Sequence, residues 1–156
     1  MKHSIFLRIF LGYALIILLL AGAVAVFAPG PMKRHHGEEQ EARLERLSAV
    51  LEGPVLSYLG GPDPGPLEAY VADVGKKTST RITVIRPDGT VLADSEKEPR
   101  DMENHLYRPE IQAALQGEQK VSIRRSPTLG REMMYMSFPL RSAGRIIGVL
   151  RLSLFM

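Results

Sequence analysis

The apolar residues form one long uninterrupted run near the N-terminus, followed by shorter segments with a helical or a strand period. Residues 9–28 read IFLGYALIILLLAGAVAVFA and contain no charged side chain. About 20 helical residues cross the roughly 30 Å hydrocarbon layer of a membrane, and no Pro interrupts the hydrogen bonds that a helix makes there. The pattern predicts a transmembrane helix at 9–28, between a short tail at 1–8 and a juxtamembrane linker at 29–37.

A cleaved signal peptide is the alternative interpretation of this run. The apolar core of a signal peptide is about 7–15 residues long, which is shorter than this run, but Ala23-Val24-Ala25 offers the small residues of a cleavage site. Basic residues lie on both sides of the run, so the positive-inside rule does not determine which end of the helix faces the cytoplasm. They are Lys2 and Arg8 before it and Lys33 and Arg34 after it.

The helical period returns after the linker, in which Pro29-Gly30-Pro31 is expected to break or kink the chain. A long amphipathic helix is predicted at 38–59, and its apolar stripe consists of Leu44, Leu47, Leu51 and Tyr58. Such a stripe packs on the domain of its own chain, or it also pairs with a second copy. We expect a homodimer through these four side chains. A second, shorter helix starts at Pro66, because Pro is favourable at a first helical position.

After residue 80 the period changes from that of a helix to that of a strand. Strands are predicted at 81–85, 91–94, 120–126, 131–140 and 145–155. The turn Pro87-Asp88-Gly89-Thr90 joins the first two strands, and a short helix at 109–117 precedes the third. The last strand is apolar on both sides, which favours a central place in the sheet. We therefore expect an α+β domain over 38–154 with five antiparallel strands.

The composition excludes several classes of function. Of the 20 Lys and Arg residues, Lys2 and Arg8 lie in the tail before the predicted span, and the remaining 18 nearly balance the 17 acidic residues. This balance argues against nucleic-acid binding, which needs a dense basic surface. The chain has no Cys, and His35-His36 has no further ligands beside it, so no metal site is expected. No catalytic or phosphate-loop motif is present, and we expect neither enzymatic activity in this chain nor a cofactor.

Two polar clusters in the predicted loops are candidate binding residues. Asp94 and Ser95 end a strand, where they either cap the following loop or contact a ligand. Asn104 and His105, with Arg108 close behind, either fasten a loop through hydrogen bonds or form the lid of a pocket. Both interpretations stay open from the sequence.

The third candidate cluster lies on the predicted strands that follow. Alternation puts Arg124 and Ser126 on one strand face, where with Tyr135 they either offer donors to an anion or are simply solvated. The planar guanidinium of Arg is suited to carboxylate and phosphate groups. We therefore expect a small anionic ligand that contacts Arg124, with Arg108 as the second contact. Glu110, near a helix start, is expected only to complement the helix dipole.

Four sequence segments, in a fixed order within residues 81–154, carry a resemblance to a known family. They read PDGTVLADS, MENHLYRPEIQAALQG, RRSPTLGREMMYMSFPL and GRIIGVLRLSL. This order resembles the sensor region of phosphate-regulon-type sensor histidine kinases. The order of the hairpins, with a long helix ahead of them, resembles the PAS-like sheet of the extracytoplasmic sensor domains called Cache domains. The resemblance implies a single Cache domain outside the cytoplasm, with residues 1–8 inside the cell and one span in the cell membrane.

The resemblance favours one function, and a second stays open. The first is the signal-sensing domain of a membrane-bound two-component histidine kinase, in which a ligand acts through unequal affinity for two arrangements of a dimer. A kinase of that family would continue with a second span, a helix bearing the phospho-accepting His and an ATP-binding domain, and this chain lacks that kinase core. The alternative is a stand-alone, membrane-anchored binding or dimerisation module without a kinase.

Overall fold

A computed structural model describes residues 5–27, 29–61, 63, 65–125 and 130–156, with the backbone alone for 25–27 and 29–36. The chain divides into two units, Met1–Gln40 and Glu41–Met156. The first unit contains α1 (Ile5–Phe27) and the first part of α2 (Pro29–Leu59). α2 therefore begins at Pro29, earlier than expected, because Pro is tolerated in the first turn, where its missing N–H has no helical partner. The linker at 29–37 is helical, and position 28 lies outside the described residues.

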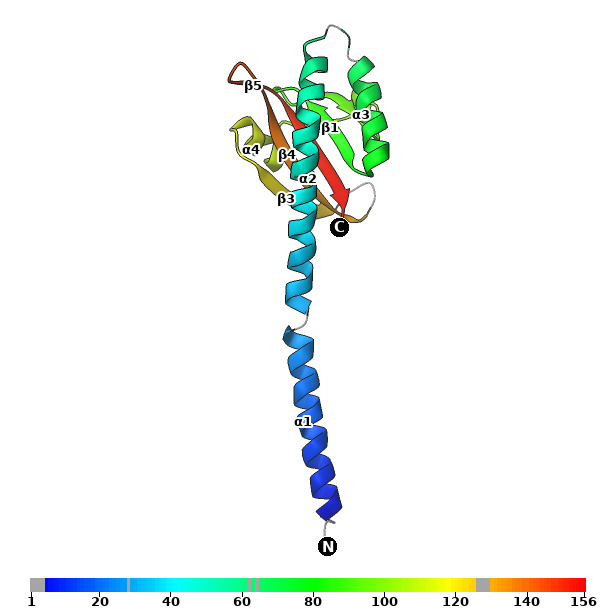
Figure 1. Cartoon of the computed structure of the whole chain (residues 1–156), viewed down its shortest axis with the longest axis vertical. Coiled ribbons are helices and arrows are strands. Elements are labelled where there is room, and N and C mark those ends of the chain that lie inside the picture. Colours follow the sequence, from blue (N-terminus) through cyan, green and yellow to red (C-terminus); the bar gives the residue numbers. More distant parts are fainter. Residues whose placement is uncertain (1–4, 28, 62, 64, 126–129) are drawn as a thin grey trace. The chain divides into compact units, whose positions relative to one another are not determined.

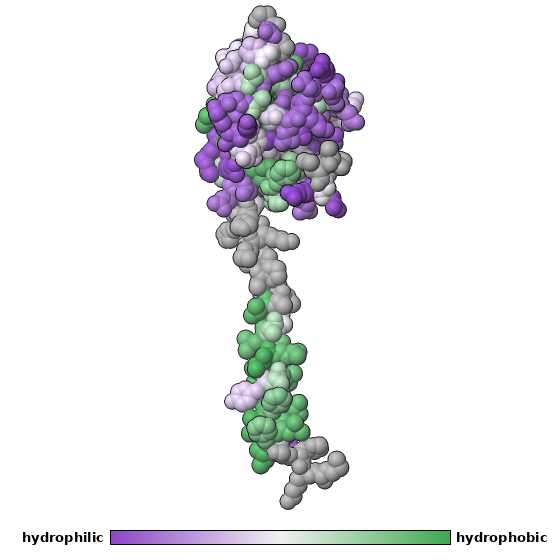
Figure 2. All heavy atoms as spheres, turned by 90° about the vertical axis from the view of Figure 1, so that its right-hand side faces the viewer, coloured by the Kyte–Doolittle hydropathy of each residue, from purple (hydrophilic) through white to green (hydrophobic). Residues whose placement is uncertain are grey.

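α1 has the length and composition of a membrane span. Its segment Ile5–Val24 is 20 residues long, strongly apolar and exposed. Figure 2 shows the apolar surface of this helix. By length and composition alone the helix fits a transmembrane segment, and a signal sequence near an N-terminus has the same properties.

The second unit is built on a five-stranded antiparallel sheet with the strand order β2-β1-β5-β4-β3 (Figure 1). The strands are β1 (Arg81–Ile85), β2 (Val91–Asp94), β3 (Lys120–Arg125), β4 (Glu132–Ser142) and β5 (Arg145–Phe155). β5 lies at the centre and pairs with both β1 and β4. The predicted strand count, antiparallel pairing and central last strand are confirmed.

α2 and α3 (Gly65–Thr78) cover one face of the sheet (Figure 1). The core between the helices and the sheet includes Leu44, Leu51, Val55, Leu67, Val71, Ile82, Leu150 and Leu152. Each fully buried aliphatic side chain contributes roughly 1.5–3 kcal/mol to folding. These contacts hold the residues of α2 from Glu41 onward to the sheet.

The predicted dimer stripe is part of this same core. Leu44 and Leu51 are 0% and 1% exposed, and Leu47 and Tyr58 pack against the same cluster. A side chain already removed from water within its own chain has no surface left for a partner, so the prediction of a dimer contact through Leu44 and Leu51 is wrong. The stripe packs on its own domain, which was the other interpretation, and homodimerisation itself stays a prediction.

The opposite face of the sheet is covered by α4 (Pro109–Leu115) and by the segment that carries the short helix η1 (Pro99–Asp101). α4 packs Ile111 and Ala114 against Ile85 and Val149 in a second, smaller apolar cluster. The expectation that β5 is apolar on both faces is wrong, because alternation places the buried polar residues Arg151 and Ser153 on the α4 side. Polar groups therefore occupy the part of this face that the small cluster leaves uncovered.

Candidate functional site

Polar and charged side chains, buried or half-buried, gather on the α4 side of the sheet. Alternate residues of β1, β4 and β5 fill the core under α2, so the pleat directs the polar residues between them to the other face. The sheet contributes Arg81, Thr83, Arg124, Tyr135, Ser137, Arg151 and Ser153, and α4 contributes Glu110. Buried polar groups need partners, so the pairing of each group shows which of them remains available to a ligand.

Glu110 and Arg124 form a two-pronged ion pair between α4 and β3. Arg124 donates from Nη1 to Oε2 at 2.9 Å and from Nη2 to Oε1 at 2.8 Å. The Glu110 side chain is 0% exposed and that of Arg124 is 26% exposed. Burial alone would raise the pKa of Glu110, but the hydrogen bonds and the charge of Arg124 hold it below its ordinary value. The expectation that Glu110 only complements the helix dipole is wrong, because its carboxylate fastens α4 to the sheet.

Arg124 also lies over an aromatic ring of the neighbouring strand. Its guanidinium carbon is 4.0 Å from the ring centroid of Tyr135, a distance typical of a cation–π contact. Burial acts to lower the pKa of Arg124, but its bonds with Glu110 raise the pKa above its usual value. Arg124 is therefore a permanent cation with a partner, and the interpretation of a merely solvated strand face is wrong.

Arg151 of β5 is the guanidinium with the weakest compensation in the cluster. The residue is 3% exposed. Its Nη2 donates to Oγ1 of Thr83 at 3.2 Å, and its Nη1 lies 3.8 Å from Oε1 of Glu110. Its Nε is buried and has no hydrogen-bond partner among the described residues. Burial lowers the pKa of Arg151 to about 10, since nearby Glu110 and Asp94 offset the loss of hydration only in part.

Asp94 holds together the first hairpin and the loop that follows it. Nε of Arg81 donates to both of its oxygens at 3.1 Å, and the Thr83 hydroxyl donates to Oδ2 at 2.7 Å. Its Oδ1 also accepts from the backbone N–H of Glu96 at 2.9 Å and of Lys97 at 3.0 Å. These contacts confirm that Asp94 caps the loop.

Ser95 has the same structural role beside Asp94. Its hydroxyl accepts from the backbone N–H of Ile82 at 3.0 Å, and its own N–H donates to the carbonyl of Ile82 at 2.9 Å. Asp94 and Ser95 line a separate cavity of about 410 Å³ beside α3 that also holds Glu68, Glu96 and Glu98. An anion is disfavoured beside these carboxylates.

Asn104 and His105 fasten the loop to the turn between β1 and β2. Asn104 donates from Nδ2 to the carbonyl of Asp88 at 2.9 Å, and the N–H of His105 donates to the carbonyl of Gly89 at 2.8 Å. The imidazole of His105 is buried, and its Nδ1 has no hydrogen-bond partner in the part of the chain that the structure describes. Burial, and then the positive charge of Arg151, lower the pKa of His105 to about 4, so the ring is neutral at pH 7.

A cavity of about 330 Å³ lies between this loop and the charged cluster. It is lined by Arg81, Lys97, Asp101, Met102, Glu103, His105, Arg108, Arg124, Tyr135 and Arg151. Five of these residues are Arg or Lys, and two are acidic. The volume falls within the range of small-molecule sites, roughly 300–1,000 Å³. The structure therefore brings together a small cavity and an excess of cationic donors.

Four of the eight residues predicted from the sequence line this cavity: Arg108, Arg124, Tyr135 and His105. Asp94, Ser95 and Asn104 support the surrounding loop instead, and Ser126 lies outside the described residues. Sequence reasoning missed Arg151 and Arg81. A signal for Arg151 was present, because it is a lone charged residue in the otherwise apolar stretch IIGVLRLSLF. Within the described ranges, no group of three or more His, Asp or Glu side chains is placed to hold a metal ion.

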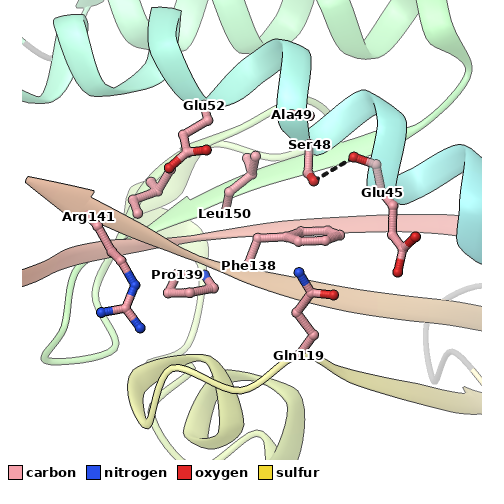
Figure 3. Close-up of a pocket in the computed structure, with 10 residues that line it drawn as sticks. Glu45, Ser48, Ala49, Glu52, Gln119, Phe138, Pro139, Arg141 and Leu150 are labelled. Atoms are coloured by element: carbon pink, nitrogen blue, oxygen red, sulfur yellow. Dashed lines mark hydrogen bonds between the residues drawn. The ribbon is translucent and has the colours of Figure 1, made fainter.

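A larger cavity, of about 490 Å³, lies between α2 and β4 (Figure 3). Glu45 and Glu52 of α2, Gln119 and Arg141 are among its lining residues. The hydroxyl of Ser48 is already used within the helix, where it donates to the carbonyl of Glu45 at 2.8 Å. Glu45 and Glu52 are exposed to water, so this cavity lacks the uncompensated buried charge found under the loop.

No protein-family model matches the sequence, and no curated protein matches it. Solved structures do match the fold. The sensor domain of the Vibrio cholerae histidine kinase DctB aligns with a TM-score of 0.64 and 17% identity over 92% of this chain and 57% of that chain. The ligand-binding domain of the Campylobacter jejuni chemoreceptor Tlp3, in complex with 4-methylisoleucine, aligns with a TM-score of 0.64 and 17% identity over 76% of this chain and 52% of that chain.

A third match is the ligand-binding domain of Mlp24 with asparagine, at a TM-score of 0.60 and 13% identity, over 85% of this chain and 58% of that chain. The chain spans little more than half the length of these solved chains. At such identities the likeness concerns the fold alone. This chain has a long helix ahead of a five-stranded antiparallel sheet, and the domain has the PAS-like, Cache-type fold of sensor domains, as the sequence predicted.

Proposed function

We propose that this chain is the extracytoplasmic signal-sensing part of a membrane-bound receptor, and that it binds a small anionic molecule in the cavity of about 330 Å³. The single observation that carries this proposal is Arg151, a residue only 3% exposed that lines the cavity and whose Nε has no hydrogen-bond partner among the described residues. A buried charge without full compensation is costly to a folded protein. An anion in the cavity would supply the missing partner.

The other lining residues support an anionic ligand. Arg124 on β3, and His105 and Arg108 in the loop before α4, offer donors, and Tyr135 offers a ring face and a hydroxyl. The matched Tlp3 structures hold 4-methylisoleucine, L-valine or isoleucine, and that of Mlp24 holds asparagine, so related folds bind small molecules with a carboxylate. A free carboxylate or an amino acid is the class of ligand that we propose here.

The receptor that we propose is a two-component histidine kinase of the phosphate-regulon type, with the kinase core outside residues 1–156. The four segments of resemblance within residues 81–154 and the sensor-domain fold support this assignment. In this arrangement the chain itself has a sensing role and no catalytic one. The ligand acts by binding one of two arrangements of the receptor more tightly than the other.

Calorimetry of the full chain in lipid nanodiscs, with acetate and L-amino acids as probes, tests the site. We expect saturable binding to the wild type, and a loss of affinity of about tenfold or more in Arg151→Gln, since a charge-assisted hydrogen bond contributes about 1.5–3 kcal/mol. Arg145→Gln is the matched control, because Arg145 lies on the same strand but is exposed and outside the cavity. Absence of binding, or equal affinities in the wild type and Arg151→Gln, would contradict the proposal.

A further inference from the structure

The buried charges around the cavity do not cancel, and this imbalance has a consequence for ligand choice. We propose that Glu110 determines which ligand charge the site accepts, an inference that rests on the proposed anion-binding function. By neutralising Arg124, Glu110 leaves Arg151 as the buried cation with the weakest compensation among the described residues, so that the site selects a group with a single negative charge. Glu110 is thereby a specificity-determining residue that acts through its partner.

The balance of charge rests on two pairs and one remaining group. Arg81 is paired with Asp94, and Arg124 with Glu110, in both cases through contacts of 3.1 Å or less. The side chains of both carboxylates are 0% exposed. Arg151, whose side chain is 4% exposed, adds a third guanidinium. The third nearby carboxylate, Glu96, lies 3.7 Å from Arg81 and is 43% exposed, so water screens it and no third buried carboxylate offsets Arg151. The buried cluster therefore carries a net charge of one positive unit.

The rim of the cavity does not change this balance. Lys97 and Arg108 line it with positive charge, and Asp101 and Glu103 line it with negative charge. The Arg108 and Glu103 side chains are 42% and 89% exposed. Opposite charges in equal number, largely in water, contribute little to the field inside the cavity. The buried excess at Arg151 is what a ligand meets.

The position of Glu110 also explains why a doubly charged group would be disfavoured. Oε1 of Glu110 accepts from Arg124 at 2.8 Å and lies 3.8 Å from Nη1 of Arg151. An anion that reaches Arg151 therefore lies close to a fixed carboxylate as well as to a guanidinium. One negative charge is balanced by Arg151, and a second would face Glu110 in a poorly hydrated place, where like charges repel strongly.

A double-mutant cycle over Glu110 and Arg124 tests the inference. Calorimetry on the full chain in nanodiscs at pH 7 and fixed ionic strength would use acetate, with one charge, and sulfate, with two. Glu110→Gln keeps the shape of the side chain and removes its charge, so we expect the ratio of sulfate to acetate affinity to rise about tenfold or more. Arg124→Gln leaves Glu110 to neutralise Arg151, and acetate affinity should fall about tenfold or more.

The double variant, Glu110→Gln with Arg124→Gln, removes both members of the pair and leaves the charge of Arg151. Acetate affinity should therefore return to within about threefold of the wild type, since removing Glu110 and Arg124 together leaves neither member of that pair unpaired and does not change the net charge around Arg151. Asp73→Asn is the matched control for net charge: Asp73 pairs with Lys77 at 2.7 Å on the exposed side of α3, away from the cavity. Its sulfate-to-acetate ratio should equal that of the wild type.

Three results would overturn the inference, and they differ in what they leave standing. An unchanged ratio in Glu110→Gln rejects charge selection but leaves the anion site. A double variant as weak as Arg124→Gln makes Arg124 the direct anchor instead of Arg151. Failure of every protein to bind either probe rejects the anion site as well. If Glu110→Gln shows no cooperative thermal transition and is therefore not folded, the acetate affinities of Arg124→Gln and of the double variant decide whether the inference stands.

Discussion

Gly89 in the first hairpin turn lies directly against the side chain of Asn104, with no space for a β-carbon between them. Gly89 has a φ of +85°, which a side chain disfavours by itself. The same turn accepts the backbone hydrogen bond of His105 at 2.8 Å. The absence of a side chain at Gly89 therefore lets the loop come close enough to make these hydrogen bonds with the turn.

Gly89→Ala should destabilise the domain by roughly 2–4 kcal/mol, because the strain of a positive φ adds to a steric conflict with Asn104 and Leu106. Thermal unfolding followed by circular dichroism measures the change. Gly144→Ala is the control: its φ is +78°, but no atom lies within 4 Å of the added carbon. That variant should lose only about 1–2 kcal/mol, and equal losses would show that the contact with Asn104 is unimportant.

The buried imidazole of His105 predicts a dependence of stability on pH. Its pKa is about 6.5 in the unfolded chain and about 4 in the folded chain, where Arg151 and Arg108 also disfavour the proton. Between these values the unfolded state binds a proton that the folded state does not. Stability should therefore fall by about 2 kcal/mol between pH 7 and pH 5, and more toward pH 4.

His105→Gln removes this dependence, and the difference between the two proteins isolates His105 from His3, His35 and His36. Urea unfolding at pH 7 and pH 5 is the measurement. If the wild type and His105→Gln lost the same stability over this interval, the imidazole would not be held neutral.

The apolar stripe of α2 should act on stability within one chain. Leu51 is 1% exposed, whereas its neighbour Val50 is 70% exposed. Leu51→Ala should cost about 2–5 kcal/mol of unfolding free energy, and Val50→Ala less than about 0.5 kcal/mol. Light scattering of both variants in detergent reports the oligomeric state. A change in that state with unchanged unfolding of Leu51→Ala would restore the dimer interpretation of this stripe.

The side of the membrane on which the domain lies can be tested with one residue. The chain has no Cys, and Tyr107 is 88% exposed, so Tyr107→Cys provides a single reactive thiol. A membrane-impermeant maleimide should label intact cells if the domain lies outside the cytoplasm, as proposed. Labelling only after lysis would reverse the orientation. Ser4→Cys, in the tail before the span, should show the opposite pattern.

The sequence predicted the sheet well and the site only in part. Alternation located all five strands, because a residue that faces the core and one that does not differ in polarity. The same alternation puts Arg151 and Ser153 on one face of β5, but the apolar residues around them predict a strand that is apolar on both sides. Glu110 was underestimated for another reason. Its partner Arg124 lies on a different element, and spacing along the chain carries no information about that contact.

The central place of β5 also determines the order in which the domain can fold. β5 is the last strand in the sequence, yet it alone joins the β1–β2 hairpin to the β3–β4 hairpin. Two isolated hairpins are marginally stable in water, and the pairing of β1 with β5 requires the closure of a long loop. The domain therefore cannot assemble progressively behind a ribosome, and its folding waits until residues 145–155 have been synthesised.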